Sequence, residues 1–260
     1  MSVSIARTVC RVNARVALFA PSIKEYAFII GAMKSGTTSL YHYLTQHPQI
    51  ARNHIQKEPE FFSRQEPPKD LRPYHRQYFP MGAGRRIALD GSTGYSKQPI
   101  FPNVAERLRA LKGKKHLIYI LRDPVDRIES HVAHRIAFQK LLLKDGERPN
   151  FGRYLSVSSY ATQLAAYKSA FPDVPVKIVL FEDLIEDAKK VLEELSRHLE
   201  IDEDFQWRFL PPQNARMARH KSEQFHLSDR ERLLLRDVLR ADMNSLADSY
   251  GVDVSRWGFS

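Results

Sequence analysis

The sequence predicts an α/β protein with a central parallel β-sheet that is flanked by helices on both faces. Short apolar runs rich in β-forming residues alternate along the chain with stretches that carry helix-start signals. The runs that we expect to form strands are residues 26–30, 87–89, 116–121 and 176–181. The chain has 260 residues, of which 43% are hydrophobic, so it can bury a large core.

Residues that typically start a helix follow two of these strands. Thr37 or Thr38 can cap a helix that runs to Pro48. Asp123 is placed to cap a second helix, with Pro124 at its first position. Each strand therefore leads directly into a helix, as a parallel sheet requires.

Three more helices are expected further along the chain. One covers residues 160–171, and another follows the strand at 176–181 and is opened by Asp183. The last begins at Ser228, which has capping-box spacing to Glu231, and stops near Gly251. No repeat or linker divides the chain after residue 24, so we expect one domain over residues 24–260.

Residues 1–23 form a basic amphipathic segment that contains no Asp or Glu. At helical spacing its apolar residues share one face and its arginines another. The apolar residues are Ile5, Val9, Val12, Val16 and Phe19, and the arginines are Arg7, Arg11 and Arg15. Periodicity alone allows two interpretations, a peripheral contact with a membrane surface or a helix packed on its own domain.

The charge of the chain favours anionic partners. Lysine and arginine number 40 against 30 acidic residues, for a formal net charge of +10. The basic residues are spread out with acids nearby, so we expect a small polyanionic ligand and no nucleic acid. No apolar run reaches the roughly 18–20 residues that span a bilayer. The single cysteine, Cys10, excludes an intrachain disulfide, and the expected compartment is the cytoplasm.

A glycine-bearing loop joins the first strand to its helix. Gly31 and Gly36 have the spacing of the phosphate loop of NTPases, but Thr37 follows Gly36 and the lysine has moved into the loop as Lys34. Such a loop directs backbone N–H groups and a helix N-terminus at an anion. A ligand-free turn is the alternative, but it does not need Lys, Ser and two Thr together. The sequence thus predicts a sheet of P-loop type.

A second motif follows the strand at 116–121. This strand ends in Arg122, where an NTPase would need an acid to hold Mg²⁺. Ser130 lies about two turns into the next helix. Arg122 through its guanidinium and Ser130 through its hydroxyl can bind one further phosphate.

Together these motifs resemble a known family. The segment F-I-I-G-A-M-K-S-G-T-T-S-L (28–40) resembles the 5′-phosphosulfate loop of sulfotransferases that use 3′-phosphoadenosine-5′-phosphosulfate (PAPS). The segment L-R-D-P-V-D-R-I-E-S (121–130) resembles their 3′-phosphate motif. The resemblance covers roughly residues 25–257. It is closest to the glycan type, such as heparan sulfate N- and 3-O-sulfotransferases and their bacterial relatives.

The resemblance implies a donor site for PAPS, with 3′-phosphoadenosine-5′-phosphate (PAP) as the product and no metal. It implies that Lys34 contacts the sulfuryl bridge and steadies the leaving phosphate. The residues that donate to the 5′-phosphate are then Ser35, Gly36, Thr37, Thr38 and Ser39. The rest of the donor-binding set comprises Arg122, Ser130, Tyr160, Arg219 and Lys221, and the choice among Arg216, Arg219 and Lys221 as the residue that closes over the donor stays open.

The resemblance also implies a general base. Glu58 matches the position of the family's catalytic glutamate, and Glu60 is its rival. The alternative is that both are surface acids of a loop. His134 lies one helical turn after Ser130 and matches a histidine that is important in the N-sulfotransferase relatives. It could orient the acceptor, protonate the leaving group, or form an ordinary hydrogen bond between helices.

The acceptor is the least defined part of the prediction. The family type favours a hydroxyl or amine of a glycan or glycolipid, with a small alcohol or amine as the alternative. Gly91 replaces a lysine on the substrate side of the heparan-modifying enzymes, which puts a densely anionic acceptor in doubt. Two other classes compete with a sulfotransferase: an ATP- and Mg²⁺-dependent kinase, and a basic protein that binds nucleic acid or membranes without catalysis. The sequence leaves the oligomeric state open.

Overall fold

The structure is a computed structural model that describes residues 23, 25–64, 74, 77–79, 84–138, 141–144, 147–209 and 225–259. Its centre is a five-stranded sheet with the order β2-β3-β1-β4-β5, in which every neighbouring pair is parallel. The strands are β1 (Glu25–Gly31), β2 (Ile50–Arg52), β3 (Ile87–Asp90), β4 (Lys114–Leu121) and β5 (Val176–Leu180). The predicted α/β class is confirmed. The three-residue strand β2 was not predicted, because three residues are too few to show a period.

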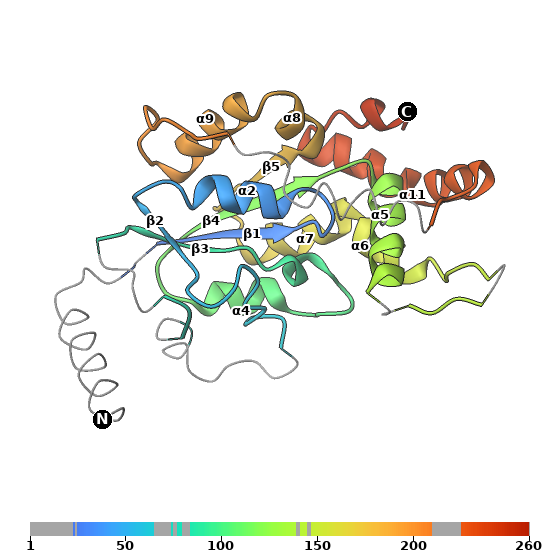
Figure 1. Ribbon diagram of the computed structural model, residues 1–260, viewed down its shortest axis with the longest axis horizontal. Coiled ribbons are helices and arrows are strands. Elements are labelled where there is room, and N and C mark those ends of the chain that lie inside the picture. Colours follow the sequence, from blue (N-terminus) through green and yellow to red (C-terminus); the bar gives the residue numbers. More distant parts are fainter. Residues whose placement is uncertain are drawn as a thin grey trace, which may run out of the picture.

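Helices cover both faces of the sheet (Figure 1). One face carries α2 (Thr37–Leu44), α8 (Phe181–Glu186) and α9 (Ala188–Leu199). The other face carries α4 (Val104–Ala110) and α7 (Tyr160–Ala170). Beyond the carboxyl ends of the strands lie α5 (Pro124–Ala137), α6 (Gly152–Ser158) and α11 (Asp229–Tyr250). Two short 3₁₀ helices, η1 (Thr93–Ser96) and η2 (Val254–Trp257), complete the described elements.

Alternate residues of β1 supply two separate cores. Phe28 and Ile30 pack into a core rich in aromatic side chains, which includes residues of α4, α5, α7 and α11. Ala27 and Ile29 point to the opposite face and pack against α2 and α9. All four are fully buried. A strand that is buried on both faces reads as an unbroken apolar run, and this is why the sequence revealed β1 so clearly.

Several helix ends agree with the sequence. The Asp123 side chain accepts from the N–H groups of Val125 (2.8 Å) and Asp126 (3.1 Å), with Pro124 in the first turn. Ser228 forms the complete capping box at the start of α11, which ends at Gly251 in a left-handed conformation. These ends were predictable because each depends on residues that are close in sequence.

Two helix starts were predicted wrongly. The residue that precedes α2 is Gly36, with φ of 84°, so neither Thr37 nor Thr38 caps the helix. The chain also turns helical directly after β5, at Phe181, and Asp187 caps the next helix, α9. In both places the backbone must turn sharply off the sheet, and this tertiary requirement overrides the capping preference of the following residues.

Strand β3 ends in a buried carboxylate that organises the neighbouring loop. Asp90 is fully buried and accepts hydrogen bonds from Ser92 Oγ (2.6 Å), Tyr74 Oη (2.9 Å) and Tyr95 Oη (2.9 Å). Burial raises the pKa of Asp90 to about 7, although these hydrogen bonds oppose the rise. Asp90 thereby holds the start of η1, which projects Thr93 toward the site described below.

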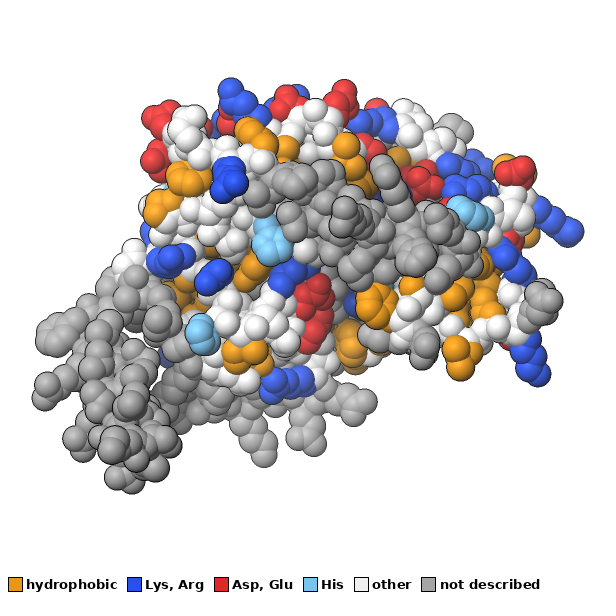
Figure 2. Space-filling model, viewed as in Figure 1, with side chains coloured by type: hydrophobic (Ala, Val, Ile, Leu, Met, Phe, Trp, Pro, Cys, Tyr) orange, Lys and Arg blue, Asp and Glu red, His pale blue; other side chains and the backbone are white. Residues whose placement is uncertain are grey.

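The N-terminal prediction lies outside the described residues, because the structure describes nothing before Ile23. Within the described part of the chain, none of the helices has both the length and the apolar composition needed to cross a membrane. Figure 2 shows Lys, Arg, Asp and Glu side chains interspersed along the edge formed by α8 and α9, rather than one block of positive charge.

The Asp90 cluster yields a stability prediction. Tyr95→Phe should lower the free energy of unfolding by about 1.5–3 kcal/mol, because it removes a hydrogen bond to a buried carboxylate. The deficit should grow as the pH rises through 7, since the charged form of Asp90 loses more than the neutral form. Urea denaturation at pH 6 and pH 8 measures both effects. Tyr167→Phe is the control: its hydroxyl donates to a neutral carbonyl, Tyr95 O (2.9 Å), so its smaller deficit should not change with pH.

Candidate active site

The loop that joins β1 to α2 has the features of an anion site. Lys34 and Gly36 both have left-handed backbone, with φ of 76° and 84°, and residues of this kind form concave clusters of N–H groups. No side chain caps α2, so the helix N-terminus offers further donors. Ser35 is fully buried, and its hydroxyl has no partner among the described residues. Gly36 is also needed for space, since a Cβ would lie 2.7 Å from the Phe181 ring.

The same loop touches the second predicted motif. Arg122 directly follows β4, and its Nη1 donates weakly to Lys34 O (3.4 Å). Its guanidinium lies 5.0 Å from the centre of the Phe181 ring and 4.0 Å from Asp126. Among the described residues nothing else engages this guanidinium, and none pairs with the Ser130 hydroxyl. Arg122 is therefore held beside the loop with donors to spare.

Tyr160 lies beneath Arg122. It is fully buried at the start of α7, and its hydroxyl donates to Arg122 O (2.9 Å). Tyr160 belongs to the donor-binding set that the sequence predicts. In the structure its hydroxyl contacts the backbone of Arg122.

A fully buried arginine that the sequence analysis missed supports the phosphate loop from inside. Arg127 Nε donates to Ser158 Oγ (2.7 Å), Nη2 to Tyr154 O (2.8 Å) and Nη1 to Met33 O (3.4 Å). Nη1 also contacts His131 Nδ1 (3.2 Å), which must be the acceptor because arginine has no lone pair to offer. Burial and the adjacent guanidinium lower the pKa of His131 far below its usual value, so this histidine is neutral. Charged residues are common in this stretch, and no local pattern distinguishes the buried one.

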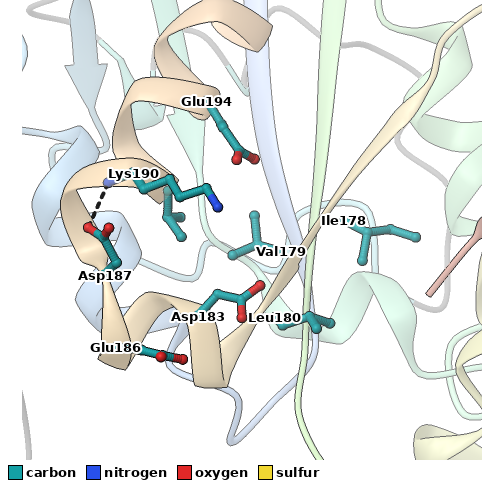
Figure 3. Close-up of a pocket in the computed structure, with 9 residues that line it drawn as sticks. Ile178, Val179, Leu180, Asp183, Glu186, Asp187, Lys190 and Glu194 are labelled. Carbon is teal, nitrogen blue, oxygen red and sulfur yellow. Dashed lines mark hydrogen bonds between the residues drawn. The ribbon is translucent and has the colours of Figure 1, made fainter. Parts of the chain in front are cut away.

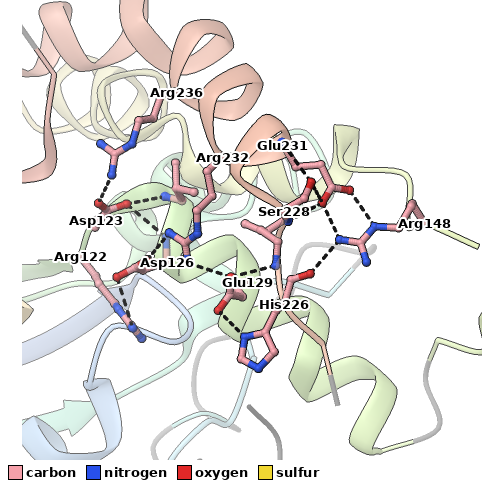
Figure 4. A network of polar contacts seen from close by, with 12 residues as sticks. Arg122, Asp123, Asp126, Glu129, Arg148, His226, Ser228, Glu231, Arg232 and Arg236 are labelled. Carbon is pink, nitrogen blue, oxygen red and sulfur yellow. Dashed lines mark hydrogen bonds and ion pairs between the residues drawn. The ribbon is translucent and has the colours of Figure 1, made fainter. Parts of the chain in front are cut away.

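Ion pairs with α11 fix the amino-terminal half of α5 (Figure 4). Arg236 donates to Asp123 (3.0 Å). Arg232 donates to Asp126 (2.9 Å) and to Glu129 (2.8 Å). These contacts join segments about 100 residues apart. They hold the helix that carries Ser130, and the N-cap next to Arg122, in one orientation.

Glu58 lies beside the phosphate loop. Lys57 Nζ donates to Glu58 Oε1 (2.8 Å) and to Thr37 Oγ1 (3.0 Å), so one ammonium bridges the glutamate and the first turn of α2. Thr93 Oγ1 donates to Glu58 Oε2 (2.7 Å). Burial raises the pKa of Glu58, but the ammonium of Lys57 and the hydrogen bonds outweigh it, and the net pKa is below the usual value. Glu58 is therefore ionised at neutral pH.

Glu60 has a different environment, although it is only two residues away. Its Oε1 accepts from Gly94 N (2.8 Å) and its Oε2 from Ser63 Oγ (2.5 Å), which ties both oxygens to the surrounding loops. Burial raises the pKa of Glu60, and the charge of Glu58 adds to the rise. Gly94 must lack a side chain here, since a Cβ would lie 2.0 Å from Glu60 Oε2. Glu58 is thus ionised, whereas both oxygens of Glu60 are used to hold the surrounding loops.

His134 is half-buried on α5, with its ring centre 4.6 Å from that of Phe138. The neutral His131 lies about one turn earlier on the same helix. A positive charge on His134 would lower the pKa of His131 further. The remaining predicted donor residues, Arg219 and Lys221 together with Arg216, lie outside the described residues.

Two surface cavities lie away from the phosphate loop. A cavity of about 470 Å³ lies between β5 and the helices α8 and α9 (Figure 3). Two of its carboxylates have other roles, since Asp183 pairs with Arg256 and Asp187 caps α9. A second cavity, of about 310 Å³, is lined by Arg135, Leu141, Pro149, Asn150, Arg153 and Tyr154. One of its lining residues, Arg135, lies on α5, the helix that carries Ser130.

No group of three or more His, Cys, Asp or Glu side chains suited to a metal ion occurs within the described ranges. Asp90 ends β3, and an acid at the end of a strand is the kind of metal ligand that a kinase would need. Its oxygens are engaged by Ser92, Tyr74 and Tyr95.

The fold and this loop define a class of protein, an α/β protein with a phosphate-binding site at the carboxyl ends of its parallel strands. Residues 24–230 match the sulfotransferase domain family. Because the match covers most of the chain, the protein belongs to this family of PAPS-dependent sulfotransferase enzymes. Membership implies PAPS as the sulfuryl donor and PAP as the product, and it sets the kinase and the non-catalytic binder aside.

Individual relatives agree with this assignment. The crystal structure of a sulfotransferase from Alicyclobacillus acidocaldarius matches 92% of this chain and all of its own, with a TM-score of 0.73 and 24% identity, and shows the same fold. The membrane-associated sulfotransferase kil1 of Dictyostelium discoideum is 34% identical over 114 residues. The human bifunctional heparan sulfate N-deacetylase/N-sulfotransferase 3 is 25% identical over 194 residues. The matches cover 43% and 66% of this chain, but only 23% and 22% of those two relatives.

Proposed function

We propose that this enzyme transfers the sulfuryl group of PAPS to a hydroxyl or amine of a glycan or glycolipid, with Glu58 as the general base. The observation that carries the proposal is the short path from base to donor loop. Lys57 Nζ contacts both Glu58 Oε1 (2.8 Å) and Thr37 Oγ1 (3.0 Å). An ionised carboxylate is thereby held next to the loop that would bind the reacting end of PAPS.

The residues of the loop fit the 5′-phosphosulfate. The buried Ser35 hydroxyl has no partner among the described residues. Together with the uncapped N-terminus of α2 and the concave backbone at Gly36, it favours an anion. We assign Lys34 to the bridging oxygen, where negative charge develops as the sulfuryl group leaves. Thr38 and Ser39, in the first turn of α2, complete the set of donors.

The residues at the end of β4 fit the 3′-phosphate. Arg122 keeps guanidinium donors available beside Phe181. Ser130 lies on α5, the helix that starts two residues after Arg122, and its hydroxyl has no hydrogen-bond partner among the described residues. A guanidinium binds a phosphate through two parallel hydrogen bonds. This second phosphate distinguishes PAPS from ATP, and its proposed ligands are the residues that α11 holds in place.

In the proposed reaction Glu58 accepts the proton of the acceptor hydroxyl or amine. The freed electron pair forms a bond to sulfur, and the bond between sulfur and the bridging oxygen breaks in line with it. That oxygen leaves with the electron pair on PAP, where Lys34 and the loop N–H groups stabilise its charge. His134 is proposed to orient the acceptor from α5.

The acceptor part of the proposal has two supports. The human relative carries heparan sulfate in its name, which favours a sugar acceptor for this chain too. The cavity of about 310 Å³ combines Asn150, two arginines and a tyrosine, and such a lining can hydrogen-bond sugar units of a long acceptor that extend beyond the phosphate loop.

Arg122→Ala should weaken PAP binding about 10- to 100-fold, because it removes charged hydrogen bonds to the 3′-phosphate. Binding of adenosine 5′-phosphosulfate, which lacks that phosphate, should change much less. Isothermal titration calorimetry at fixed ionic strength measures both affinities. Arg109→Ala, which removes an exposed arginine from α4, controls for net charge and should leave both nearly unchanged. Equal losses for the two ligands would contradict the assignment.

Glu58→Gln should reduce turnover by about 10²- to 10⁴-fold, the usual contribution of a general base, while PAP affinity stays near normal. Transfer from ³⁵S-labelled PAPS to an acceptor fraction measures turnover. Glu60→Gln is the matched control and should keep most of the activity, since an amide can still accept from Gly94 and Ser63. Near-normal activity of Glu58→Gln, or a larger loss in Glu60→Gln, would exclude Glu58 as the base.

Incubation of the enzyme with ³⁵S-labelled PAPS and fractionated cell extract should label a polysaccharide or glycolipid fraction. Glycosidase digestion followed by mass spectrometry would identify the sulfated group. Label that appears only in small alcohols or amines would overturn the acceptor class and leave the donor assignment intact.

A further inference from the structure

Lys57 is buried to a degree that is unusual for a lysine. Its side chain is only 15% exposed, whereas lysines normally keep the ammonium in water. Its Nζ donates to Thr37 Oγ1 (3.0 Å) on α2 and to Glu58 Oε1 (2.8 Å) on the following loop. The ammonium therefore joins the phosphate loop to the carboxylate that the proposed reaction uses as a base.

The fold keeps a space open for this lysine at Gly91. Gly91 N donates to Lys57 O (3.1 Å), which aligns the two backbones. A Cβ at position 91 would lie 3.1 Å from both Cγ and Cε of Lys57, and 3.0 Å from the Tyr41 ring. The φ of Gly91 lies outside the left-handed region, so the backbone itself does not require glycine. A side chain at this position would require the Lys57 stem and the Tyr41 ring to move by a few tenths of an ångström.

The other groups around Glu58 do not make this link. Thr93 Oγ1 donates to Glu58 Oε2 (2.7 Å) from η1. Lys97 and Glu60 act on Glu58 by charge, and neither forms a hydrogen bond with it among the described residues. Lys57 alone in this group contacts both the carboxylate and α2.

We propose that Lys57 is a positioning residue that holds Glu58 against the donor loop, and that Gly91 is the side-chain-free position that lets Lys57 reach it. This inference rests on the proposed role of Glu58 as the base. It also assigns an orientation to Thr37. Since Thr37 Oγ1 accepts from Lys57, its own hydrogen remains free to donate to the 5′-phosphate. One ammonium thus orients the base and one donor of the loop.

The primary test is Lys57→Met, which keeps the length of the stem and removes the charge. With the protein saturated with PAP, the pKa of Glu58 is read by ¹³C NMR from the carboxyl signal that is missing in Glu58→Gln. It should rise by roughly one unit or more, because burial then acts without the adjacent cation. The rate of sulfuryl transfer from ³⁵S-labelled PAPS should fall at least about 10-fold, whether it is measured with the acceptor fraction of the cell extract or with water as the acceptor. The dissociation constant of PAP should rise by less than about 5-fold, because only one hydroxyl loses its orientation.

Four further variants separate positioning from general effects. Gly91→Ala should raise the pKa of Glu58 in the same direction with Lys57 still present, and Lys57→Met/Gly91→Ala should be no worse than Lys57→Met, since both changes act on one contact. Lys57→Arg should restore much of the normal pKa. Lys97→Met removes a nearby cation that does not hydrogen-bond Glu58, and should shift the pKa less than Lys57→Met does.

An unchanged Glu58 pKa in Lys57→Met, or equal shifts in Lys57→Met and Lys97→Met, would overturn the inference. If Lys57→Met does not fold, Gly91→Ala and Lys57→Arg still decide, because a normal Glu58 pKa in Gly91→Ala contradicts the role of the open position. Failure of the proposed function would give a different result. An active Glu58→Gln enzyme would show that Glu58 is not the general base. An inactive Glu58→Gln enzyme together with a normal Lys57→Met enzyme would refute only the positioning role of Lys57.

Discussion

The active-site end of the molecule depends on one buried guanidinium. Arg127 donates to the phosphate loop at Met33 and to α6 at Tyr154 and Ser158, so one side chain joins these two segments. A buried cation is costly unless every donor is engaged. His131, on the next turn of α5, supplies one of the acceptors by remaining neutral and accepting from the arginine. The loop between β1 and α2 is therefore supported by a polar contact inside the core.

The surroundings of the two glutamates also set their charge states. Glu58 and Glu60 share one short loop, yet a lysine ammonium keeps the first ionised while burial favours the protonated form of the second. The difference comes from what each carboxylate meets across the fold: Lys57 and Thr93 for Glu58, Ser63 and Gly94 for Glu60. Two carboxylates with opposite pKa shifts can therefore occupy neighbouring positions with the same side chain.

Much of the fold could be predicted from the sequence, since the informative signals were local. Strands β1, β3 and β4 are buried on both faces and appear as apolar runs, and the caps at Asp123 and Ser228 depend on residues three apart or fewer. The edge strand β2 and the start of α2 escaped prediction. The first is too short to show a period, and the second is decided by the left-handed turn at Gly36, which follows from how the loop leaves the sheet.

The sequence by itself determined the α/β class, the phosphate loop around Lys34 and the arginine at the end of β4, because each is written in residues that are adjacent along the chain. Only the folded arrangement of the chain buries Arg127, brings the Tyr160 hydroxyl to the backbone oxygen of Arg122, and places the Lys57 stem beside Gly91. Burial and the state of ionisable groups depend on partners from distant segments, and such partners leave no pattern in a single local stretch.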